Sequence, residues 1–151
     1  MAVTGCGSPD GPQAAAEPDA GRPDDSCPLF DYSSWDGGRP VASFSADVAP
    51  ILERSCSFED CHGAPSAAAS PRDFLVRYVG TMGETSDEIP LITAAQPGRS
   101  LLMHKLDATQ ACAGLSCAID GCGGSMPPGL LLDRPERDVI RRWIYQGAKA
   151  D

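Results

Sequence analysis

Aromatic residues and histidines are scarce in this chain of 151 residues. Aromatic side chains make up only 6% of the sequence, so the core that they and the aliphatic residues can form is modest. Only two histidines are present, and no glycine-rich loop ends in a lysine. The sequence therefore shows neither a Ser-His-Asp set nor a phosphate-binding loop. We predict a single domain that is not an enzyme.

Basic residues are also few, with 12 Lys and Arg against 21 Asp and Glu and a formal net charge of −9. This balance argues against nucleic acid as a partner, because phosphate binding needs clustered Lys and Arg. A negative surface can instead steer the protein towards a basic docking partner. No segment approaches the run of about 18 apolar residues that indicates a membrane-spanning helix.

Cysteine, glycine and proline are abundant by contrast, with 7, 16 and 14 residues. So many cysteines in a chain of this length argue for an oxidising compartment, and hence for an exported protein. Four of them form an even set that suffices for two disulfides: Cys27, Cys112, Cys117 and Cys122. Four cysteines can pair in three ways, and the sequence leaves these open. We favour one bridge inside the loop of residues 112–128 and one to Cys27.

A pair of cysteines followed at once by a histidine stands in the first half of the chain. Four residues separate Cys56 from Cys61, and His62 follows directly. Thiols in this order attach a haem through its two vinyl groups, and the adjacent histidine becomes the proximal iron ligand. The usual spacing has two residues between the cysteines, so this motif is a wider variant. It predicts a covalently bound haem c.

A second iron ligand is expected if such a haem transfers electrons, and a thioether suits this role because it raises the potential. Met126 is followed by Pro127 and Pro128, which stiffen the backbone, and the nearby glycines let the chain approach a flat ligand. We therefore predict Met126 as the sixth ligand. Met82 and Met103 are interpreted as apolar residues that fill the core. His104 is interpreted as a surface histidine, and it is the alternative sixth ligand of the iron if Met126 is not.

These features together resemble a class I cytochrome c over about Phe44 to Ala150. The resemblance implies an all-α, loop-rich fold around one haem. It implies thioether bonds at Cys56 and Cys61, with His62 and Met126 as axial ligands of the iron. It also implies electron transfer to redox partner proteins or within a larger membrane redox complex.

Apolar periodicity predicts four helices. The first has Asp47 as its N-cap and leads into Cys56, and the last begins at a capping box that starts with Asp133 and is stopped by Gly147. The predicted helices cover Ser45 to Arg54, Ser70 to Gly80, Arg99 to Leu106 and Asp133 to Gln146.

Residues 1–40 are rich in Pro, Gly, Ala and Asp, a composition that predicts a disordered linker ahead of a cytochrome-like domain at residues 41–151. Near its start, Val3 to Cys6 resembles a bacterial lipobox. We expect a lipid on Cys6 that anchors an exported protein at the periplasmic face of a membrane or at the cell surface.

The end of this linker departs from its composition. Phe30, Tyr32 and Trp35 are expected to dock it on the domain, with Cys27 as a covalent tie.

Two alternatives of other classes remain open. One is a zinc-binding module, although no second Cys or His pair stands at finger spacing. The other is a disulfide-stapled extracellular interaction domain without haem, in which Cys56 pairs with Cys61.

Overall fold

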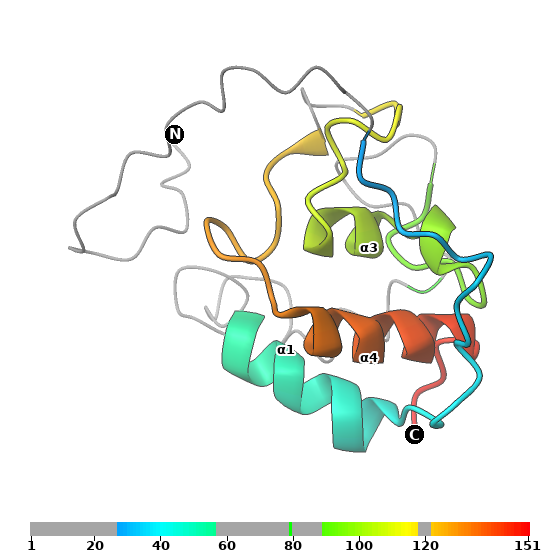
Figure 1. The fold of residues 1–151 in the computed structure, drawn as a ribbon. Helices are drawn as coiled ribbons and strands as arrows, with labels where there is room; N and C mark the ends of the chain where they lie inside the picture. The colour runs from blue at the N-terminus through cyan, green and yellow to red at the C-terminus, as the bar shows by residue number, and fades with distance from the viewer. Residues whose placement is uncertain (1–26, 57–78, 80–88, 118–121) are drawn as a thin grey trace.

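The computed structural model describes residues 27–56, 79, 89–117 and 122–151 (Figure 1). Its elements are, in chain order, the π-helix η1 (Phe44–Val48), helix α1 (Ala49–Cys56), the 3-10 helix η2 (Pro97–Arg99), helix α3 (Leu101–Leu106) and helix α4 (Arg134–Tyr145). An isolated parallel bridge joins Val79 to Ile92. Within the described ranges, none of the helices has the length and apolar character to cross a membrane. The predicted helical, loop-rich class is thus confirmed for the described residues.

Helices η1 and α1 form a continuous segment that begins before the predicted start. The N-cap is Ser43, whose hydroxyl accepts a hydrogen bond from the Ala46 amide at 3.0 Å. Asp47 lies inside the first turn, where its carboxylate accepts from the Ser43 amide at 2.8 Å. The prediction of Asp47 as N-cap was therefore wrong. Ser43 satisfies the free amides one turn earlier, and Asp47 completes a reciprocal cap.

The predicted helix from Arg99 to Leu106 is present as η2 followed by α3. Leu101, Met103 and Leu106 point into the core and are almost completely buried, which confirms Met103 as apolar filling. The predicted helix from Ser70 to Gly80 lies outside the described residues, except for Val79.

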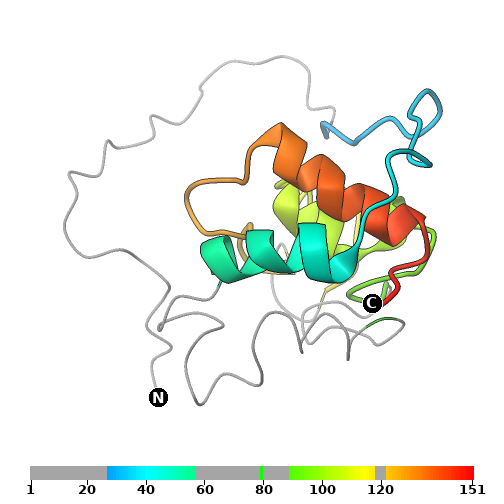
Figure 2. The same ribbon diagram turned by 90° about the horizontal axis from the view of Figure 1, so that it is seen from below.

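Helix α4 confirms the predicted caps. The Asp133 carboxylate accepts from the Glu136 amide at 2.9 Å, and Gly147 follows the helix with a φ of 105°. The buried Trp143 packs against Phe44 of η1 at a tilt, with ring centroids 5.1 Å apart, and its indole N–H donates to the Lys149 carbonyl at 2.7 Å. Helices α1 and α4 lie side by side in both ribbon views (Figures 1 and 2).

Residues 27–40, the N-terminal strap, pack along α4. The rings of Phe30, Tyr32 and Trp35 contact one another, and Trp35 meets Tyr145 of α4 edge to face at 5.6 Å. The strap is tied at its start by a disulfide between Cys27 and Cys112. The expected docking of these aromatic residues is thus confirmed.

A buried ion-pair cluster joins α3 to α4. Asp107, the C-cap of α3, accepts two hydrogen bonds from the Arg141 guanidinium, at 2.6 and 2.7 Å, and one from Arg137 at 2.8 Å. The Arg141 side chain is only 2% exposed, and its guanidinium lies 3.8 Å from the ring centroid of Phe30 in the strap. One residue of α4 therefore holds both α3 and the strap.

Candidate functional site

Two of the four predicted haem-binding residues lie in the part of the chain that the structure describes. Cys56 is the last residue of α1, and Met126 lies in the loop between α3 and α4. Cys61 and His62 lie outside the described residues, as do Met82 and Cys6.

Cys56 carries a free thiol at the end of α1. Its side chain is half-buried and packs against the hydrophobic core. Burial raises the pKa of the thiol from an ordinary value of 9.0 to about 11, because the desolvated thiolate is disfavoured. The sulfur is therefore a neutral thiol at physiological pH.

The other four described cysteines are paired. Cys27 bonds to Cys112, and Cys117 bonds to Cys122. This is the pairing that we favoured, with one bridge inside the loop of residues 112–128 and one to Cys27. Among the described cysteines, Cys56 is thus the exception, and it is the one that begins the Cys-Cys-His motif from which haem attachment is predicted.

Met126 is half-buried, unlike Met103, which is 2% exposed in the core. The end of α1 and the loop that contains Met126 lie on the same side of the molecule in both ribbon views (Figures 1 and 2). An ion pair between Arg54 and Glu136 joins the end of α1 to the start of α4 on this side. Cys56 and Met126 therefore come from elements on the same side of the molecule, and neither sulfur has a disulfide partner or another ligand role within the described residues.

Side chains from α3 and from the turn that follows α3 bind the loop before Met126. The Lys105 ammonium donates to the carbonyls of Cys122 and Gly124, at 2.6 and 3.2 Å. Between them, the Gly123 carbonyl accepts from the Gln110 side chain at 3.3 Å. Three consecutive carbonyls of the loop thus bind two side chains that come from one short stretch of chain.

The same stretch also holds Met126 itself, whose amide donates to the Lys105 carbonyl at 3.0 Å. Lys105 is only 7% exposed, and burial lowers the pKa of its ammonium group. Sequence reasoning did not identify Lys105 or Gln110. A lysine in the last turn of a helix ordinarily indicates a solvated cation near the helix C-terminus, and the carbonyls that bind it are not visible in a side-chain pattern.

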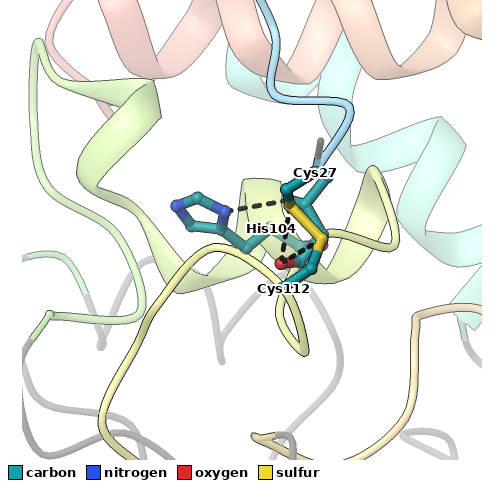
Figure 3. The surroundings of a disulfide bond; sticks show 4 residues. Cys27, His104 and Cys112 are labelled. Atoms are coloured by element: carbon teal, nitrogen blue, oxygen red, sulfur yellow. Dashed lines mark hydrogen bonds between the residues drawn. A yellow bond between two sulfur atoms is a disulfide. The ribbon is translucent and has the colours of Figure 1, made fainter. Parts of the chain in front are cut away.

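His104, the alternative ligand, has local partners for both ring nitrogens. Its Nδ1 lies 2.9 Å from the Thr109 hydroxyl, and its Nε2 lies 3.2 Å from the Gly98 carbonyl. Figure 3 shows the ring beside the Cys27–Cys112 disulfide. These contacts favour a structural role for His104 where α3 meets the strap.

An open pocket of about 630 Å³ lies on this side, lined by His104, Tyr32 and Met103 among others. The Tyr32 ring also covers Gly98, where an added Cβ would lie 3.0 Å from it. The pocket is therefore the crevice that remains between the strap and α3.

Within the described ranges, no three His, Cys, Asp or Glu side chains come together as a metal site. The function is accordingly inferred from Cys56, Met126 and the sequence motif. Comparisons with protein-family models, with curated proteins and with solved structures found no match to this chain.

Proposed function

We propose that this protein is an electron-transfer protein with one covalently bound c-type haem. Cys56 and Cys61 would form the thioether bonds, and His62 and Met126 would be the axial ligands. The observation that carries the proposal is the free thiol of Cys56, because the four other described cysteines form disulfides. Among the described cysteines, the one without a disulfide is the residue that opens the Cys-Cys-His motif.

The position of Met126 supports the second half of the ligand set. A methionine that fills a core is buried, as Met103 is, whereas Met126 is half-buried in a braced loop. When bound, the haem would supply a one-electron redox centre, and a thioether ligand would raise its potential. Cys56 and Met126 would fix the position of that centre relative to α1 and the loop.

The two disulfides support an oxidising compartment, and therefore export. We propose that the protein acts in the periplasm or at the cell surface, anchored through a lipid on Cys6. Its partners would be other redox proteins, including a larger membrane redox complex. The net charge of −9 favours basic docking surfaces on them.

An absorption spectrum of protein made in a host that matures c-type cytochromes tests the proposal. We expect a red protein with a sharp Soret band and, when oxidised, a weak sulfur-to-iron charge-transfer band near the red end of the spectrum. Met126→Ala should abolish that band and lower the potential. Met103→Leu is the control, since it changes a core methionine, and should leave the band in place.

The second candidate is a disulfide-stapled extracellular interaction domain without haem, which the two disulfides also fit. In that case the purified protein is colourless, and mass analysis finds a third disulfide that joins Cys56 to Cys61. The two candidates therefore differ in the fate of Cys56, which has no disulfide partner among the described residues.

A further inference from the structure

We propose that Lys105 is a positioning residue for Met126, which holds the loop of residues 122–126 so that the thioether is presented to the iron. The inference rests on the proposed function. Lys105 neither binds the haem nor belongs to a recognised motif. Its contacts with both ends of one short loop support the proposed role.

The first contact is made by the side chain. The Lys105 ammonium is buried and donates to the Cys122 and Gly124 carbonyls. It pairs with no carboxylate within the described part of the chain, so these carbonyls are its described partners. A buried cation is tolerated only where it is hydrogen-bonded, so the ammonium and the two carbonyls hold one another in place.

The second contact is made by the backbone. The Lys105 carbonyl accepts from the amide of Met126, two residues past the last carbonyl that the ammonium binds. A single residue therefore fixes positions 122, 124 and 126 of the loop. The bond to the Met126 amide adjoins the Cα from which the thioether side chain extends, so a displacement of the loop would displace the sulfur.

The loop needs such external partners because of its own conformation. Cys122 and Gly123 have φ values of 59° and 75°, in the left-handed region that a non-glycine residue rarely adopts. Gly123 and Gly124 lose much conformational freedom when they are ordered. The Cys117–Cys122 disulfide restricts the loop at its start, and the Lys105 contacts restrict it up to Met126.

Lys105 and Lys149 are the only two lysines of the chain, which provides a matched pair of variants. Lys105→Met keeps the apolar stem and removes the ammonium, and Lys149→Met does the same at an exposed position. Gln110→Met removes only the bond to Gly123 and is the milder second variant if Lys105→Met does not fold.

The first measurement is amide hydrogen exchange in the folded, disulfide-intact protein, which reports on the loop whether or not haem is present. In Lys105→Met we expect the Met126 amide to exchange about tenfold faster or more, since a tenfold change corresponds to about one net hydrogen bond. Exchange of the Ile144 amide in α4 should be unchanged, as should all amides in Lys149→Met. If the Met126 amide keeps its protection in Lys105→Met, Lys105 does not hold the loop and the proposal is overturned.

The second measurement uses the haem-loaded protein and separates positioning from general stabilisation. Lys105→Met should weaken the sulfur-to-iron band and lower the potential, and Gln110→Met should do so to a smaller extent. Lys149→Met should do neither. If Lys105→Met loosens the loop but leaves the band and potential as in the unmutated protein, the positioning role is refuted. An unmutated protein without haem would refute the proposed function, and with it the role of Lys105 towards iron, whereas the exchange experiment would still show whether Lys105 braces the loop.

Discussion

The cluster of Asp107, Arg137 and Arg141 offers the sharpest test of how this fold is held together. Asp107→Asn preserves the shape of the side chain and removes its charge. Arg141 is 2% exposed and directs two hydrogen bonds at the Asp107 carboxylate, so its guanidinium would lose its main counter-ion without gaining access to water. Arg137 would lose its bond to the same carboxylate.

The magnitude follows from the burial. Removal of one partner of a buried ion pair typically costs 3–5 kcal/mol, because it leaves an uncompensated buried charge. Asp138 also pairs with Arg141 and remains in place, so we expect the lower end of that range, about 3 kcal/mol. For a chain of this length such a loss corresponds to a fall in Tm of about 10 °C.

Urea denaturation followed by tryptophan fluorescence, with the disulfides kept intact, measures this change. Glu53→Gln removes a carboxylate from an exposed position on α1, and we expect it to change the free energy of unfolding by less than about 0.5 kcal/mol. The double variant Asp107→Leu with Arg141→Met removes the buried charge together with its partner, and should recover much of the loss. If Asp107→Asn costs no more than Glu53→Gln, the cluster does not stabilise the fold as described.

Three further predictions concern the cysteines. Replacing both Cys27 and Cys112 by Ser removes a link across a sequence separation of 85, and should lower the free energy of unfolding by about 2–4 kcal/mol in the same urea assay. In haem-free protein with Cys61→Ser, alkylation of Cys56 by iodoacetamide should rise with pH to a midpoint near 11. Stability from its buried thiol should be complete below about pH 9.0 and lost as the pH rises through 11, and a midpoint near 9.0 would refute the burial of Cys56. Expressed with its native upstream region, the protein should partition into detergent and Cys6→Ala should not; equal partitioning would refute the lipid anchor.

Local sequence signals predicted the parts of the fold that depend on neighbouring residues. Asp133 predicts the start of α4 because its side chain accepts from a free amide of the first turn. Gly147 predicts the end of the helix because a glycine readily adopts the positive φ found there. The docking of Trp35 followed from a different signal, a run of aromatic residues inside a polar, glycine-rich segment. Such side chains gain stability only by burial against the domain.

The sequence was less informative where more than one residue could make the same contact. Asp47 was assigned as an N-cap, yet the cap is Ser43, because both residue types accept amide hydrogen bonds and only the backbone path selects between them. The role of Lys105 could not be predicted at all. Its partners are backbone carbonyls far along the chain, and every residue has such a carbonyl.

The central claim is that Cys56 and Cys61 bind a haem covalently, and the intact mass after extraction with acidified acetone tests it most directly. That treatment removes non-covalently bound haem and leaves thioether-linked haem on the chain. From a host that matures c-type cytochromes, we expect the extracted protein to retain the mass of one haem, and Cys56→Ser with Cys61→Ser to retain none. Complete loss of haem from the unmutated protein, or a colourless protein in which these two cysteines are joined by a disulfide, would contradict the account.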